Sequence, residues 1–176
     1  IYVEKAKLRV AERFERDAKL LKSLDHPKIV KLHDYFIEEH RAFLMLEYIE
    51  GTTLQEKVQL HGAIAEAEVL KLANQMLDIL DYLHSRTPPV VHRDFTPDNL
   101  MVNDEGEVKL IDFDVALEAD ETVKSKVTIV GKQNFLPPEQ FRGHPCPQSD
   151  IYALGATLYF LLTAREPDAL DSCHPQ

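Results

Sequence analysis

The sequence predicts a single α+β domain. Its 176 residues suffice for one domain with a sizeable core, but not for two of ordinary size. Helical and strand-like segments are mixed in the first half, and the second half is increasingly helical. The regular alternation of strand and helix that gives a parallel βαβ sheet is missing. These features favour small sheets beside a helical region.

The first half should contain one helix and two strands. Apolar side chains recur at helical spacing between charges over Val10–Leu24. Pro27 ends this helix, because proline disfavours helical backbone in the residue before it. Strands are expected over Ile29–Ile37 and Ala42–Tyr48, and Gly51 then interrupts the chain.

The remaining elements follow from the same patterns. A short helix over Leu54–Leu60 should precede a long one over Glu66–Ser85. The long helix carries an apolar stripe formed by Val69, Leu72, Ala73, Met76, Leu80 and Leu83. Leu100–Val102 and Val108–Ile111 are expected to form a hairpin. The segment Ser149–Thr163 is apolar on all sides, which predicts a helix that is buried all round.

Composition and charge exclude several classes of function. The formal net charge of −10 argues against binding to nucleic acid or to an anionic membrane. Cys146 and Cys173 have no pairing or metal-binding spacing, which fits a reduced, cytoplasmic compartment. There is no apolar run long enough to span a membrane, although attachment of a longer parent protein to a membrane stays open. The abrupt ends at Ile1 and Gln176 are interpreted as cuts in such a parent.

Chemically suggestive residues follow the long helix. The loop His92-Arg93-Asp94-Phe95-Thr96-Pro97-Asp98-Asn99 precedes the hairpin, and Asp112-Phe113-Asp114 ends it. Oxygen ligands such as those of Asn99 and Asp112 are the kind that Mg²⁺ prefers. Asp94 could orient and deprotonate an attacking hydroxyl. Taken singly, Asp94 could form an Asx-turn and Asp112 a solvated strand end, but together they favour a catalytic site.

These motifs give the sequence its resemblance to a known family. With H-R-D-x-x-x-x-N, D-F-x, Pro137-Pro138-Glu139 and Asp150 in this order, it resembles the bacterial serine/threonine protein kinases of eukaryotic type. The resemblance covers essentially all 176 residues, but only part of such a domain. It implies an N-lobe remnant over residues 1–48, with the third helix and following strands. Residues 49–176 would be the hinge and a helical C-lobe up to its central apolar helix.

The resemblance implies that ATP and Mg²⁺ bind between the lobes. The backbone of Glu47 and Ile49 would meet the adenine, Leu46 would be the gatekeeper and Met101 the pocket floor. Core packing is the alternative reading of these four positions.

Further residues would have structural or regulatory roles by the same resemblance. Asp17 would pair with the ATP-positioning lysine, and Leu21, His92 and Phe113 would stack in a column that links the lobes. Asp150 would accept the amides of the His92-Arg93 turn. Arg93 would pair with a phosphorylated Thr122, Ser125 or Thr128. Glu139 would pair with an arginine of the family's last helices, which we expect to lie outside the 176 residues.

The sequence also departs from the family pattern. Thr96 stands where a lysine is usual, and Lys132 where a threonine is usual. Our hypothesis is that the pair is exchanged, so that the Lys132 ammonium still flanks Asp94; the alternative is that Lys132 points to solvent. Asp114 replaces the usual glycine after Phe113, which should make the loop flip less easily.

The six glycines form no G-x-G-x-x-G phosphate lid, and no V-A-I-K-like strand is present. We therefore expect the parent protein to transfer the ATP γ-phosphate to serine or threonine of proteins, and the 176-residue segment alone to be inactive. The alternatives are a pseudokinase or nucleotide-binding scaffold, and a small-molecule kinase of the same fold.

Overall fold

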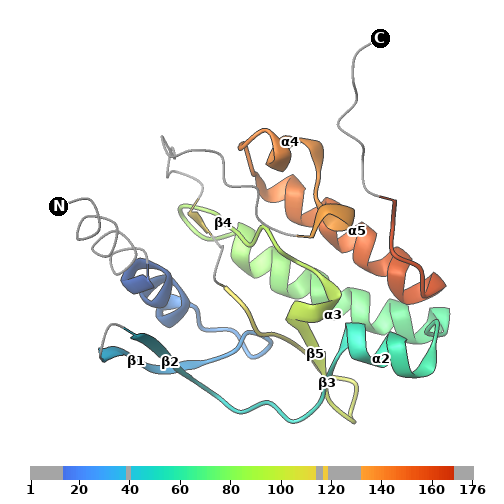
Figure 1. Cartoon of the computed structure of the whole chain (residues 1–176), viewed down its shortest axis with the longest axis horizontal. Coiled ribbons are helices and arrows are strands. Elements are labelled where there is room, and N and C mark those ends of the chain that lie inside the picture. Colours follow the sequence, from blue (N-terminus) through green and yellow to red (C-terminus); the bar gives the residue numbers. More distant parts are fainter. Residues whose placement is uncertain (1–13, 39–40, 114–116, 119–131, 169–176) are drawn as a thin grey trace.

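The computed structural model describes residues 14–38, 41–113, 117–118 and 132–168 (Figure 1). A helix over residues 14–23 comes first. The strands that follow are β1 Leu32–Glu38, β2 Arg41–Leu46, β3 Thr52–Thr53, β4 Val90–Val91, β5 Leu100–Val102, β6 Val108–Leu110 and β7 Leu117–Glu118. The α-helices are α2 Leu54–His61, α3 Glu66–His84, α4 Pro138–Phe141 and α5 Pro147–Thr163, and the 3₁₀ turns are η1 Pro97–Asn99 and η2 Gln133–Phe135.

The strands form three small sheets, which confirms the expected α+β class. Strands β1 and β2 make an antiparallel hairpin in which Leu32 lies opposite Leu46. Strands β3, β5 and β6 form a three-stranded sheet in that order, and β4 pairs with β7. The predicted hairpin over Leu100–Val102 and Val108–Ile111 is present, one residue shorter at its end.

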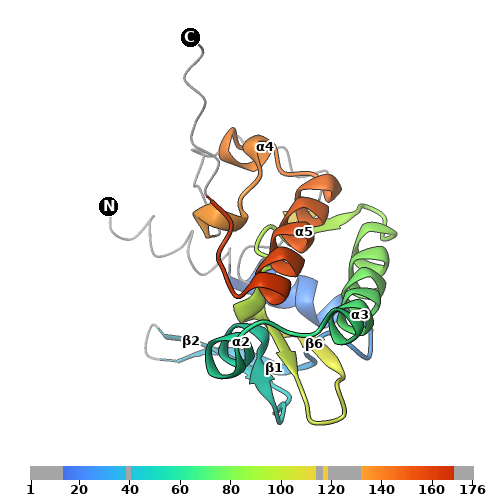
Figure 2. The same cartoon turned by 90° about the vertical axis from the view of Figure 1, so that its right-hand side faces the viewer.

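Helices α3 and α5 lie side by side and form the centre of the molecule (Figures 1 and 2). The predicted stripe of α3 is buried as expected, with Ala73 partly so. Phe160 and Leu161 of α5 and Phe95 of the loop after β4 belong to the same core. Full burial of such a side chain stabilises the fold by about 1.5–3 kcal/mol. Because Phe95 belongs to it, this core also anchors the loop after β4.

Local contacts fix the elements around this core. The Thr53 hydroxyl accepts the Glu56 amide and the Glu56 carboxylate accepts the Thr53 amide, a capping box that starts α2. Gly51 passes so close to β5 that an added Cβ would lie 2.4 Å from the Val102 carbonyl oxygen. The Gln75 side chain of α3 donates to the Gly106 carbonyl at 2.8 Å and accepts the Val108 amide at 3.0 Å. The β5–β6 hairpin is therefore tied to α3.

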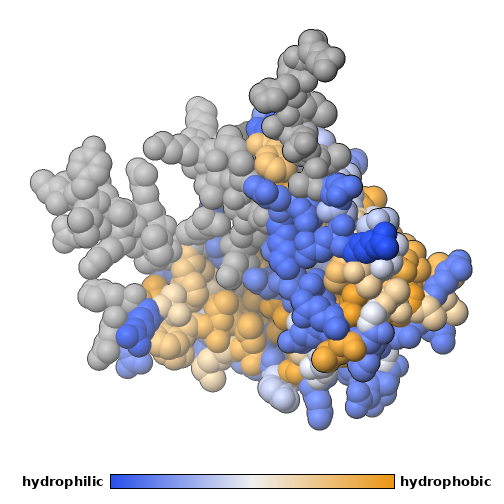
Figure 3. Space-filling view, turned by 45° about the vertical axis from the view of Figure 1, so that its right-hand side comes forward, coloured by the Kyte–Doolittle hydropathy of each residue, from blue (hydrophilic) through white to orange (hydrophobic). Residues whose placement is uncertain are grey.

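Among the described residues, large apolar side chains are exposed on the β1–β2 hairpin and on α5, among other places. Phe36 and Phe43 of the β1–β2 hairpin stack at 5.0 Å and are 41% and 39% exposed. Figure 3 shows that apolar areas reach the surface on the face that it draws. On α5, Tyr159 and Leu162 are exposed as well. The prediction that Ser149–Thr163 is buried on all sides is therefore wrong within the described residues, because α3 covers only one face of α5.

Across the described part of the chain, no helix combines the length and apolar character needed to cross a bilayer.

Candidate active site

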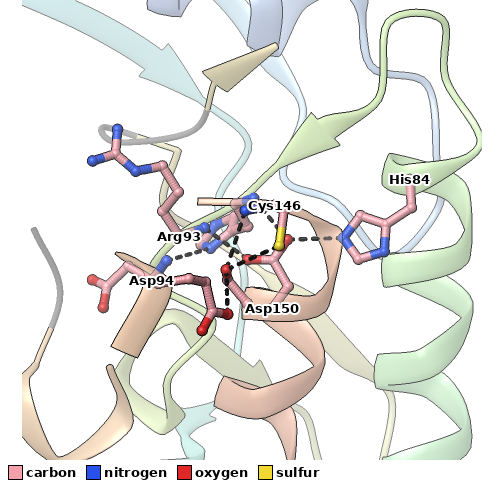
Figure 4. Close-up of polar contacts among 8 residues, drawn as sticks. His84, Arg93, Asp94, Cys146 and Asp150 are labelled. Atoms are coloured by element: carbon pink, nitrogen blue, oxygen red, sulfur yellow. Dashed lines mark hydrogen bonds and ion pairs between the residues drawn. The ribbon is translucent and has the colours of Figure 1, made fainter. Parts of the chain in front are cut away.

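The loop after β4 is held by a buried carboxylate on α5. The Asp150 side chain is fully buried, and its oxygens accept the amides of His92 at 2.9 Å and Arg93 at 2.8 Å. This is the contact predicted from the sequence. His84, at the end of α3, lies 2.8 Å from the same carboxylate through Nε2 (Figure 4). The sequence analysis did not predict the His84 contact. The position of His84 in the last turn of the helix before the loop could have suggested that its ring contacts the loop or its support.

The carbonyl groups of the loop are also held, by three side chains. Gln140 of α4 donates to the Arg93 carbonyl at 2.6 Å, and Thr157 of α5 donates to the Phe95 carbonyl at 3.1 Å. Asn99 donates to the Asp94 carbonyl at 2.9 Å. Sequence reasoning gave Asn99 a role but missed the other two, because an uncharged side chain on a helix carries no pattern that points to a loop far along the chain.

The Asp94 carboxylate has one bonded and one unbonded oxygen. Its Oδ2 accepts the Asn99 side-chain amide at 2.9 Å, whereas Oδ1 is buried and has no hydrogen-bond partner among the described residues. Burial raises the pKa of Asp94, and the nearby Asp112 raises it further. The electrostatic effect of the His92 ring, the hydrogen bond from Asn99 and the nearby Lys132 backbone amide oppose that rise without cancelling it. A carboxylate in this state accepts a proton more readily than an exposed one.

Asp112 lies next to this group. The His92 ring accepts the Asp94 amide through Nδ1 at 3.3 Å, which leaves Nε2–H to donate to the Asp112 carbonyl. The Phe113 ring meets the His92 ring edge-on at 5.0 Å. Leu21 is also buried in the core, and its place in the predicted column stays a prediction. Asp94, Asn99 and Asp112 are thus brought to one place rather than to opposite sides of the molecule.

The oxygen donors fit a magnesium ion. The Asn99 amide nitrogen is used by Asp94, which leaves the Asn99 Oδ1 oxygen for a cation, and Asp112 offers a carboxylate. Among the described residues there is no cluster of three or more His, Cys, Asp or Glu that could hold a metal. Two protein ligands completed by phosphate oxygens are the usual arrangement for Mg²⁺ in phosphoryl transfer.

The exchange of Thr96 and Lys132 is a prediction that the structure corrects. The Lys132 ammonium forms an ion pair with Asp98. The Thr96 hydroxyl is buried and, within the part of the chain that is described, has no hydrogen-bond partner. Both Lys132 and Asp98 are partly exposed, so the ammonium keeps part of its hydration there. Reaching the buried Thr96 would require its desolvation, which is costly for a charge.

The predicted hinge residues follow β2. The Glu47 carboxylate accepts Lys109 at 2.6 Å and the Lys31 amide at 2.9 Å. Burial alone would raise the pKa of Glu47, but these two hydrogen bonds, together with the electrostatic effects of Lys109 and His33, outweigh it and lower the pKa. Leu46 ends β2, and Ile49 is partly buried against the core. Met101 lies in β5 opposite Thr53. Their contacts with adenine remain a prediction.

The other predicted residues are placed as follows. Asp17 lies on the first helix, with its Oδ1 3.6 Å from Arg16 Nε, and its side chain is 19% exposed. The Glu139 carboxylate accepts the Ser149 hydroxyl at 2.8 Å, so α4 is bonded to the first turn of α5. Asp114, Thr122, Ser125 and Thr128 lie outside the described residues.

Comparisons with known proteins identify the family of the chain. Serine/threonine-protein kinase B of Synechocystis sp. is 37% identical over 94% of this chain, and PrkC, a serine/threonine-protein kinase of Bacillus subtilis, is 36% identical over 88%. CBL-interacting protein kinase 21 of Oryza sativa is 33% identical over 91%. The chain spans only 30%, 24% and 31% of the lengths of these three relatives. The family described as "Protein kinase domain" matches residues 1–172, and this chain therefore belongs to it.

Proposed function

We propose that the full-length protein transfers the γ-phosphate of ATP to serine or threonine hydroxyls of proteins. The observation that carries the proposal is the Asp94 carboxylate, whose Oδ2 is fixed by Asn99 while the buried Oδ1 is unpartnered among the described residues. A buried acceptor without a donor is costly, and an incoming substrate hydroxyl would remove that cost. Membership of the kinase family and the names of the relatives support the same reaction.

Each side chain has a defined part in this mechanism. Asp94 would accept the hydrogen bond of the substrate hydroxyl, orient it for in-line attack and take its proton. The raised pKa of Asp94 makes that acceptance more favourable. Asn99 and Asp112 would hold Mg²⁺, and the Glu47–Ile49 backbone would hold the adenine. Mg·ATP, when bound, supplies the phosphoryl group and neutralises its charge. The isolated 176-residue segment, which has no Gly-rich phosphate lid, should be inactive.

The test compares the full-length protein with its Asp94→Asn variant. Radiolabelled ATP and a general protein substrate are supplied, and the labelled amino acids are identified after acid hydrolysis. Loss of the base should lower kcat by about 10²–10⁴-fold, with label on serine or threonine in the wild type. Asp104→Asn, an exposed residue in the β5–β6 turn, is the matched control.

The alternatives give different results in the same assay. Binding of Mg·ATP without any transfer would identify a pseudokinase. Transfer to a small molecule but to no protein would identify a small-molecule kinase. An Asp94→Asn variant with nearly full activity would show that Asp94 is not the base.

A further inference from the structure

The peptide bond between Arg93 and Asp94 is held at both ends by side chains. Its carbonyl accepts Gln140 Nε2 at 2.6 Å, and its amide donates to His92 Nδ1 at 3.3 Å. The Cα of Asp94 follows directly, so the plane of this peptide sets the direction in which the carboxylate of the proposed base leaves the backbone.

This peptide needs external support. Arg93 has a φ of +73°, a left-handed conformation that is unfavourable for residues other than glycine. Asp150 binds the amides of His92 and Arg93, which belong to the two preceding peptides. Asp150 therefore fixes the two peptides before Arg93, whereas Gln140 fixes the peptide that follows it.

Gln140 is well built for such a contact. It is 3% exposed, and the short helix α4 that carries it is bonded to α5 through Glu139 and Ser149. A side chain fixed in this way gives a hydrogen bond with little loss of conformational freedom.

We propose that Gln140 is a positioning residue for Asp94: its amide donates to the Arg93 carbonyl and thereby fixes the peptide from which the base projects. This inference rests on the proposed function. It requires a donor at the end of the side chain, since the Arg93 carbonyl can only accept.

Two variants of the full-length protein separate positioning from simple packing. Gln140→Leu keeps a buried side chain of similar volume but removes the donor, and kcat should fall about 10–100-fold with the KM for ATP changed less than about twofold. Gln140→Glu has nearly the same shape. Its ionised form cannot donate, but its protonated form can, and burial raises its pKa. The ratio of its kcat to that of the wild type should therefore rise several-fold as the pH is lowered from about 8 to about 6.

Hydrogen exchange of the amides in residues 92–96 gives a readout without activity. Exchange should be about tenfold faster in Gln140→Leu, with α3 unchanged. Gln148→Leu, an exposed glutamine in the first turn of α5, is the matched control for both measurements and should behave as wild type.

The inference would be overturned by a kcat for Gln140→Leu within twofold of wild type, by a flat pH ratio for Gln140→Glu, or by equal exchange in residues 92–96 of Gln140→Leu and wild type. A loss of kcat fully explained by a lower folded fraction in thermal unfolding would do the same. If the wild type transfers no phosphate, the proposed function fails, and the exchange measurement alone decides the role of Gln140.

Discussion

Replacing Asp150 should destabilise the fold by an amount that depends on how many hydrogen bonds the substitute can keep. Asp150 is fully buried and bonds two amides and the His84 ring. A buried donor left without an acceptor costs about 1–3 kcal/mol. In Asp150→Ala both amides lose their acceptor, so the free energy of unfolding should fall by about 2–6 kcal/mol.

Asp150→Asn should cost less. Its oxygen can still accept one amide, and its NH₂ group can donate to His84 if that ring changes tautomer, so one amide remains unsatisfied and the expected cost is about 1–3 kcal/mol. Urea unfolding of the chain, followed by far-UV circular dichroism, measures both values. Asp81→Asn on the exposed side of α3 is the control and should stay within about 0.5 kcal/mol of wild type. Equal midpoints for wild type and Asp150→Ala, or equal losses in both variants, would refute the reasoning.

Three further measurements concern the charged groups. Phosphate transfer should decline as the pH falls through the raised pKa of Asp94, because only the ionised carboxylate can take the proton; a flat kcat down to about pH 4 would contradict this. Glu47→Gln should lower the free energy of unfolding at neutral pH by less than about 1 kcal/mol. That difference should disappear as the pH falls through the lowered pKa of Glu47, since the stabilisation needs the ionised carboxylate, and a loss that persists in acid would count against it. Lys132→Ala should lower kcat by less than about threefold, since the Lys132 ammonium pairs with Asp98 rather than with the proposed base. A hundredfold loss would instead support the hypothesis that Lys132 acts beside Asp94 in place of a lysine at position 96.

The fold could be predicted well wherever a hydrophobic pattern is long. The helix expected over Glu66–Ser85 is observed over Glu66–His84, because its apolar stripe has one period throughout. The start of α5 was placed two residues late. Serine is a favoured N-cap, but Pro147 occupies the first turn, and Ser149 instead accepts the Cys146 amide from inside the helix.

The residues of the candidate site could be predicted from the sequence, but the side chains that hold them in place mostly could not. Asp94 and Asn99 lie five residues apart in one loop, so their contact follows from local spacing. Gln140 and Arg93 are 47 residues apart, and His84 and Asp150 are 66 apart. Contacts at such separations depend on how α3, α4 and α5 pack, which periodicity does not encode. The partner of Lys132 was missed for a related reason: the cost of burying an ammonium group decides between Thr96 and Asp98, and burial is known only from the fold.

The attachment of the β5–β6 hairpin to α3 through Gln75 has a consequence for ligand binding. The hairpin leads into Asp112 at its end, and the same helix reaches the support of Asp94 through His84. Helix α3, with 19 residues and a length of about 28 Å, therefore supports both Asp112, the proposed metal ligand, and Asp94, the proposed base. Under the proposed function, the separation of these two groups is set before the nucleotide binds, so binding energy need not be spent on assembling this half of the site.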